Sequence, residues 1–431
     1  MLKIALKPHR ASLRAGVTDP QKLFVMLKLL PEAEVAQARP PFAVALVIDT
    51  SGSMSGDKLN QAMQAAHTLI DDDRLAGSDQ VTVIHFDDSA APLIRLCPAS
   101  QKGDLHRAVD ELGRHSGGTH MARGMECALQ ELSRVPAQTA KRVVLLTDGE
   151  TFDEPECPLV AQRFADANTP IVAVGVGDEY NENLLLEIAN SSAGRPYHLK
   201  GIADFRQVLE DELGTGVKEV VTDLQASVSL VKGVQVDGFT KVFPSLTEVA
   251  IADPPYRLGN IPAGDYTYFI VEMTVSGIPR PPSRARLARL GLAGHVPGLG
   301  RRDELPPEDL FVEFTNDEAA IAAVDAEVLA YVQQKNVDRM VQEAVRQSTS
   351  DPTRARQTLQ AAAGMTQRLG NAAATQMLTG ALDELNKTGT ISAGTRKTVA
   401  LGGKTKTVKA GGSDGLGDVP SEDEIRRLTG T

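Results

Sequence analysis

The chain has 431 residues, 42% of them hydrophobic, and this length predicts two to four globular domains. Its 45 basic and 56 acidic residues give a net charge of −11 at pH 7, which argues against a nucleic-acid-binding protein. The first residues carry no signal-peptide pattern, and no apolar stretch approaches the ~18 residues that span a bilayer. The three cysteines lack the spacing of metal ligands, so we expect reduced thiols in a cytoplasmic protein.

Residues 1–40 contain two strand patterns, an alternating one at 2–6 and a longer apolar one at 22–30. Further strand patterns, separated by Pro and Gly, occur between residues 221 and 315. We expect both groups to form one β-sandwich, with the intervening domain inserted in one of its loops. In the simpler alternative, residues 1–40 extend the edge of the sheet that follows them.

Residues 41–220 alternate strand and helix patterns. Apolar strands separated by amphipathic helices predict a doubly wound, mostly parallel, Rossmann-like α/β sheet with both faces covered. The segment 92–97 follows its predecessor too closely for a helical crossover and is predicted to be an antiparallel edge strand. The expected strands are 42–49, 80–87, 92–97, 142–147, 170–176 and 196–199, and the expected helices are 57–72, 102–112, 120–134, 157–167, 181–191 and 203–213.

Residues 316–386 are rich in Ala, Gln, Leu and Arg at helical spacing. Breaks at 350–352 and 370–371 predict three helices in a bundle or hairpin. We expect these helices to pack on one another and on the sandwich. The alternative is that their Ala-rich faces receive a helix of a partner protein.

Residues 387–431 are predicted to form a flexible, basic tail rich in Thr and Gly, with a short terminal helix capped by Ser421. Thr398 and Thr407 lie in two similar basic motifs and are candidate phosphoacceptors that a forkhead-associated domain would read. A solvated linker that ends in a docking peptide is a simpler interpretation. An electrostatic tether to an acidic surface is a third.

Oxygen-bearing side chains gather at the expected carboxyl ends of the strands. In an open parallel sheet these ends meet at one edge, where ligands bind. Hydroxyls and carboxylates are the ligands of Mg²⁺, with Mn²⁺ as an alternative, and the absence of His and Cys from the motifs argues against zinc. The candidate metal-binding residues are Asp49, Ser51 and Ser53 after the strand 42–49, Thr119 after Gly117 and Gly118, and Asp148 after the strand 142–147. Taken alone, the first motif is also compatible with a simple strand-ending turn.

This arrangement resembles a von Willebrand factor type A (VWA) domain of the bacterial intracellular type, over roughly residues 40–220. The D-x-S-x-S motif at Asp49, the Thr119 position and the T-D-G motif at Asp148 match the metal-ion-dependent adhesion site of that family. The resemblance implies that Ser51, Ser53 and Thr119 coordinate the metal directly, whereas the two aspartates act through water. It also implies that the metal accepts an Asp or Glu side chain from a partner.

The expected function is therefore a non-enzymatic, metal-dependent interaction module or scaffold. We place it in bacterial Ser/Thr phosphosignalling, with the tail as a second docking site and a kinase or forkhead-associated protein as partner. An accessory factor of a MoxR-type AAA+ ATPase is the alternative. A metal-dependent hydrolase is less favoured, since its base would have to be His85, His120 or Glu150. We interpret His85 as a packed, satisfied strand residue, His120 as a surface residue and Glu150 as part of the rim of the site.

Overall fold

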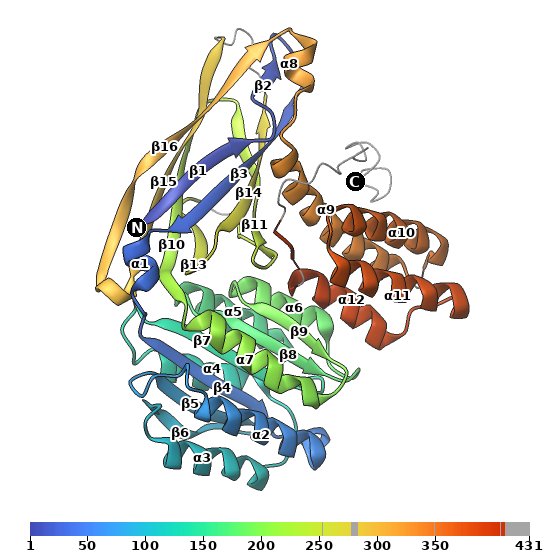
Figure 1. The fold of residues 1–431 in the computed structure, drawn as a ribbon. Helices are drawn as coiled ribbons and strands as arrows, with labels where there is room; N and C mark the ends of the chain where they lie inside the picture. The colour runs from blue at the N-terminus through green and yellow to red at the C-terminus, as the bar shows by residue number, and fades with distance from the viewer. Residues whose placement is uncertain (252, 277–282, 349, 406, 410–431) are drawn as a thin grey trace.

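The computed structural model describes all residues except 252, 277–282, 349, 406 and 410–431. A β-sandwich, an α/β domain and a group of helices form three parts of the molecule, and Figure 1 shows the helices beside both other parts. Among the described residues, no helix is long and apolar enough to cross a membrane.

The α/β domain is built on a six-stranded sheet, in the order β6-β5-β4-β7-β8-β9. All neighbouring strands are parallel except β5 and β6, so the antiparallel edge strand is confirmed. The strands are β4 (Phe42–Asp49), β5 (Gln80–Phe86), β6 (Ala90–Pro98), β7 (Ala140–Thr147), β8 (Ile171–Val176) and β9 (Arg195–Leu199).

Helices cover both faces of this sheet, as the continuous apolar strands predicted. One face packs on α2 (Asp57–Asp71), α3 (Lys102–Glu111) and α7 (Phe205–Gly216). The other packs on α4 (Met121–Leu132), α5 (Cys157–Asp166) and α6 (Glu182–Ser191). Every residue of β4 is buried, as expected for a central parallel strand.

Two five-stranded sheets share one apolar core and form the sandwich. The strand β3 pairs with β14, and β2 pairs with β16, so the N-terminal strands belong to the sandwich and not to the edge of the α/β sheet. The predicted insertion is thus confirmed. One sheet contains β1 (Leu2–Pro8), β3 (Gln21–Pro31), β14 (Thr267–Val275), β11 (Val234–Phe243) and β12 (Thr247–Glu248). The other contains β13 (Tyr256–Pro262), β10 (Glu219–Leu230), β15 (Arg284–Val296), β16 (Arg301–Thr315) and β2 (Ser12–Arg14).

A buried ionic network lies where the α/β domain returns to the sandwich. Arg142 of β7 forms an ion pair with Glu219 of β10 and lies 3.7 Å from Glu212 of α7. Glu212 also accepts a 2.8 Å hydrogen bond from the Tyr197 hydroxyl. The side chains of Arg142, Glu219 and Glu212 are almost fully buried. Glu212 also pairs with Arg195 at 3.2 Å, and Glu219 accepts a 2.7 Å hydrogen bond from Asn260, so each buried carboxylate has more than one partner.

The helical region begins with α8 (Glu318–Ala322) and α9 (Ala326–Gln347), followed by α10 (Pro352–Arg368) and α11 (Ala372–Thr388). The predicted breaks before α10 and α11 are confirmed, and Asp325 adds a break because its side chain caps α9. Tyr331 of α9 stacks on Tyr268 of β14 at a centroid distance of 4.5 Å. Helices α9 to α12 share an apolar core, so they pack on one another and on the sandwich.

The prediction of a flexible tail from Lys387 is wrong for residues 393–405, which form helix α12 (Ala393–Thr405). Lys397 explains why, since its buried ammonium donates to the carbonyl oxygens of Asp178, at 2.9 Å, and Tyr180. It also lies 3.9 Å from the centroid of the Tyr180 ring. A segment with weak helix propensity is thus held by tertiary contacts with the α/β domain. The helix predicted after Ser421 lies outside the described residues.

Candidate functional site

Asp49 ends β4 and organises the loop that follows it. Its Oδ1 accepts a 2.8 Å hydrogen bond from the Ser51 amide, and its Oδ2 accepts a 2.6 Å bond from the Thr147 hydroxyl. Both carboxylate oxygens are therefore engaged inside the protein, and burial raises the pKa of Asp49 to about 6. This aspartate fixes the shape of the loop and links β4 to β7.

Ser51, Ser53 and Asp148 come together directly. The hydroxyls of Ser51 and Ser53 lie 3.1 Å apart, and the Ser53 hydroxyl donates to Asp148 Oδ1 at 2.7 Å. The other oxygen of Asp148 pairs with the ammonium of Lys58, at the start of α2. Asp148 is fully buried, so the lysine and the serine hydroxyl are what balance its charge in this structure.

Thr119 lies on a loop that touches both of the other loops. The Gly52 amide donates to the Gly117 carbonyl at 3.0 Å, and the Phe152 amide donates to the Thr119 carbonyl at 3.0 Å. Gly118 packs closely in this loop, because an added Cβ would lie 2.6 Å from Asp88 Oδ1 and 2.9 Å from the Phe152 ring, so these two side chains would have to move. Backbone contacts thus bring Thr119 to the same edge. Side-chain hydrogen bonds join Ser51, Ser53 and Asp148, and Asp49 is linked to them through the Ser51 amide.

These residues make a suitable donor set for a hard divalent cation. Serine and threonine hydroxyls and one carboxylate are oxygen ligands of the kind that Mg²⁺ and Mn²⁺ take. Each oxygen of Asp49 already accepts a hydrogen bond from the protein, which fits a supporting role. Lys58 was missed from the sequence, although its place in the first turn of the helix after the D-x-S-x-S motif puts it near the strand ends.

The rim of this edge has an apolar and a charged side. Phe152 is 75% exposed, and its ring lies 5.5 Å from that of His120. On the other side, Gly149 and Glu150 line a hollow of about 650 Å³ together with residues 178–182 and with Arg396 and Lys397 of α12. Glu150 thus lies at the rim, as expected.

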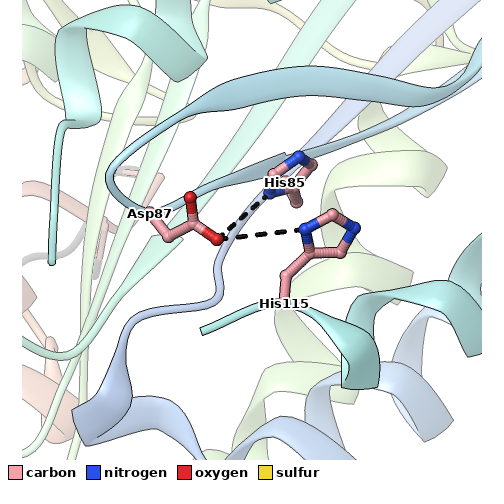
Figure 2. Close-up of side chains that lie close together, drawn as sticks. All are labelled: His85, Asp87 and His115. Atoms are coloured by element: carbon pink, nitrogen blue, oxygen red, sulfur yellow. Dashed lines mark ion pairs between the residues drawn. The ribbon is translucent and has the colours of Figure 1, made fainter. Parts of the chain in front are cut away.

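The histidines proposed as bases surround Asp87 instead. His85 is buried, as predicted, but the expectation that it is satisfied is wrong, because its Nδ1 has no hydrogen-bond partner. It stacks on His115 at a centroid distance of 3.7 Å, and both rings lie beside the Asp87 carboxylate (Figure 2). His120 Nδ1 lies 3.2 Å from the Asp87 carbonyl oxygen.

The candidate phosphoacceptors are both half-buried. The Thr398 hydroxyl donates to the Gly394 carbonyl within α12 at 2.8 Å. The Thr407 hydroxyl donates to the Pro244 carbonyl at 2.6 Å. Each hydroxyl is therefore engaged with the backbone rather than presented in an extended, exposed segment.

Comparison with known families identifies two parts of the chain. Residues 43–213 match the von Willebrand factor type A domain, over the α/β domain described above. The chain contains a VWA domain. Residues 326–409 match a second family, described as the Sll0103-like, C-terminal alpha-helical domain. The second match extends through α12, in agreement with the ordered helix there.

Two bacterial proteins are similar to this chain over about half of their own length. A Synechocystis protein, "Uncharacterized protein sll0103", is 28% identical over 52% of this chain and 54% of its own length. The Escherichia coli protein YfbK is 22% identical over 62% of this chain and 48% of its own length. The chain thus spans about half the length of these curated relatives.

Solved structures share the whole architecture. A VWA protein from Catenulispora acidiphila matches 94% of this chain and 97% of its own, with a TM-score of 0.79 and 20% identity. The ArnB paralog VWA2 from Sulfolobus acidocaldarius matches 95% of this chain and 99% of its own, with a TM-score of 0.60 and 16% identity. At these identities the likeness concerns the fold. It covers the sandwich and helices as well as the VWA domain.

Proposed function

We propose that this protein is a metal-dependent protein-interaction module. Mg²⁺, or Mn²⁺ in its place, binds at Ser51, Ser53 and Thr119, with Asp49 and Asp148 in supporting positions. The metal then accepts a carboxylate from an Asp or Glu of a partner protein. The observation that carries the proposal is the hydrogen-bonded set of Ser51, Ser53 and Asp148 at the carboxyl edge of the sheet.

The charge balance supports an electrophilic metal. Hydroxyl ligands bring no negative charge, Asp49 is engaged by Ser51 and Thr147, and Asp148 is already paired with Lys58. A divalent ion in this setting keeps most of its positive charge. An external carboxylate is the ligand that such an ion attracts most strongly.

We propose binding rather than catalysis. His85 and His115 lie against Asp87, and His120 lies at the Asp87 carbonyl, so none of these rings is held by a residue of the metal set. Glu150 lines the neighbouring hollow with Arg396 and Lys397. A scaffold also fits the joining of the VWA domain to two further parts that extend its surface.

The choice of partner is a separate proposal. A forkhead-associated protein or a kinase requires access to Thr398 or Thr407, whose hydroxyls bind backbone carbonyls, so α12 and the segment after it would first have to open. A MoxR-type AAA+ ATPase requires no such opening and remains the alternative partner.

A pair of neighbouring serines provides the test. Ser53 contacts Asp148, whereas Ser55, on the same loop, donates to the Gly52 carbonyl at 2.7 Å and is exposed. We expect Ser53→Ala to weaken Mg²⁺ and Mn²⁺ binding in calorimetry and to abolish Mg²⁺-dependent capture of a partner from lysate. Ser55→Ala should leave both unchanged. Equal metal affinity in the two variants would refute the assigned ligands, and capture that ignores EDTA would refute the metal-dependent interaction.

A further inference from the structure

His85, Asp87 and His115 form a second cluster of metal-ligating side chains. Asp87 Oδ2 lies 3.6 Å from His85 Nδ1 and 3.9 Å from His115 Nδ1. Figure 2 shows both rings turning these nitrogens toward the same carboxylate oxygen. One ligand atom from each residue lies within 4.8 Å of the others.

The cluster is largely buried. The side chains of His85 and Asp87 are only 3% and 7% exposed, and that of His115 is 32% exposed. The 3.6 Å separation is too long for a hydrogen bond, and His85 Nδ1 has no other partner. A buried nitrogen without a partner is costly, so this atom points to a missing ligand.

Asp87 is oriented for such a ligand by its neighbours. Its Oδ1 accepts hydrogen bonds from the Ser89 amide at 2.8 Å and the Ser89 hydroxyl at 2.9 Å. These bonds leave Oδ2 directed at the two imidazoles, with only a long 3.4 Å contact from the Thr50 hydroxyl. Hydrogen bonds to the non-ligating oxygen are how proteins fix a carboxylate ligand at a metal centre.

We propose that His85 Nδ1, Asp87 Oδ2 and His115 Nδ1 bind a transition-metal ion, with Zn²⁺ as the expected occupant. Zn²⁺ bonds to nitrogen and oxygen are about 2.0–2.2 Å long, so tetrahedral ligands lie about 3.3–3.6 Å apart. The separations of the two nitrogens from Asp87 Oδ2, 3.6 and 3.9 Å, need a contraction of a few tenths of an ångström, and the two nitrogens, which lie within 4.8 Å of each other, must also be reoriented because the rings are stacked. His115 makes the adjustment by turning out of its stack on His85, and water fills the fourth position on the exposed side.

This site is chemically distinct from the one proposed for Mg²⁺. Two imidazoles select a borderline metal, whereas the hydroxyl-rich edge at Ser51 and Ser53 selects a hard one. The two sites are nevertheless adjacent, because His115 precedes the loop of Gly117 and Thr119. A metal on His115 would therefore hold the start of the loop that carries Thr119. The zinc proposal stands independently of whether the other site binds a partner.

Titration of the full chain with Zn²⁺ tests the proposal. The protein is first treated with chelator and dialysed, and excess Mg²⁺ is kept present to occupy the oxygen site. We expect one equivalent of Zn²⁺ in calorimetry. Co²⁺ in place of Zn²⁺ should give the visible absorption bands of a four-coordinate site with imidazole ligands.

The decisive variant is His115→Ala, because this partly exposed residue can be removed without opening the core. His106→Ala is the matched control, since His106 lies in another histidine pair, with its Nδ1 2.7 Å from that of His67. We expect His115→Ala to lose at least about tenfold in Zn²⁺ affinity, since removing even a supporting partner of a metal site costs about 10–100-fold. His106→Ala and Ser53→Ala should retain the affinity.

Three results would overturn the proposal: no Zn²⁺ binding by the wild-type chain, unchanged affinity in His115→Ala, or loss of the site in His106→Ala. The last would place the metal on the His67 pair. Circular dichroism confirms folding of each variant. If His115→Ala does not fold, His115→Gln, which keeps the bulk but removes the imidazole, gives the same discrimination.

Discussion

Replacing Lys58 by methionine should strengthen metal binding at the Ser51 and Ser53 edge. The Lys58 ammonium pairs with one oxygen of Asp148, while the Ser53 hydroxyl lies 2.7 Å from the other. An ion bound at Ser53 would therefore share Asp148 with a fixed positive charge. Methionine keeps most of the length of the side chain and removes that charge.

The size of the effect follows from Coulomb's law. With a carboxylate between them, a unit charge and a divalent ion are separated by about 5 Å, and in a medium as polarisable as water they repel by about 1.7 kcal/mol. The Lys58 side chain is 42% exposed, so the high dielectric is the appropriate choice. The dissociation constant for Mg²⁺ should then fall by about fifteen- to twentyfold, since each 1.4 kcal/mol corresponds to a factor of ten.

The same change should lower the free energy of unfolding of the metal-free protein. Lys58→Met leaves the fully buried Asp148 with only the Ser53 hydroxyl, and we expect a loss of about 1 kcal/mol because one partner is half in solvent. Added Mg²⁺ should restore it by binding the folded state alone. Calorimetry and urea unfolding, with Lys58→Arg and Lys102→Met as charge-keeping and distant controls, measure both effects. Weaker or unchanged Mg²⁺ binding in Lys58→Met would refute the electrostatic reasoning.

Three further changes test other parts of the structure. Lys397→Met should release α12 from the VWA domain, because the lysine ammonium donates to the carbonyls of Asp178 and Tyr180. Hydrogen exchange in residues 393–405 should then become faster. The same change at the exposed Lys387 should have no effect. Arg142→Leu should cost about 3 kcal/mol, because it leaves the buried Glu219 without its ion-pair partner, whereas Glu212 keeps Arg195. A two-step unfolding curve should follow if this network couples the VWA domain to the sandwich. Burial lowers the pKa of His9 from 6.5 to about 4, so the unfolded chain takes up a proton first as the pH falls below 6.5. Protonation of His9 in the unfolded chain should lower the free energy of unfolding by about 2 kcal/mol by pH 5. In urea titrations, a His9→Gln variant should therefore lose less unfolding free energy between pH 7 and pH 5 than the wild-type chain.

Local patterns were sufficient to predict the VWA core. The bounds of β4 agree with the prediction at both ends, because a fully buried parallel strand is a continuous apolar run that stops at the polar Asp49. The edge strand β6 is longer than the predicted 92–97, since hairpin pairing with β5 extends it to Ala90 and Pro98. Insertion in the sandwich was also predictable, because strand patterns on both sides of the α/β domain need partners.

Features that depend on long-range contacts could not be predicted in this way. Helix α12 is rich in Gly and Thr, and it is fixed by Lys397, more than two hundred residues from its partner Tyr180. The ion pair of Lys58 with Asp148 and the meeting of His85 with His115 likewise depend on how loops pack, not on spacing along the chain. The strand pattern around His85 indicated burial correctly, but it held no information about whether Nδ1 found a partner.

Because of where α12 lies, the VWA domain and the C-terminal helical domain line one hollow together. Lys397 holds the backbone of Asp178 and Tyr180, and these residues line the hollow that Gly149 and Glu150 share with Arg396. Gly149 directly follows Asp148, so a partner whose carboxylate reached a metal there would lay its flanking residues along this hollow. It would then contact the VWA domain through Glu150 and the C-terminal helical domain through Arg396. Specificity for the partner would accordingly depend on both domains, while affinity for the metal depends on the VWA domain alone.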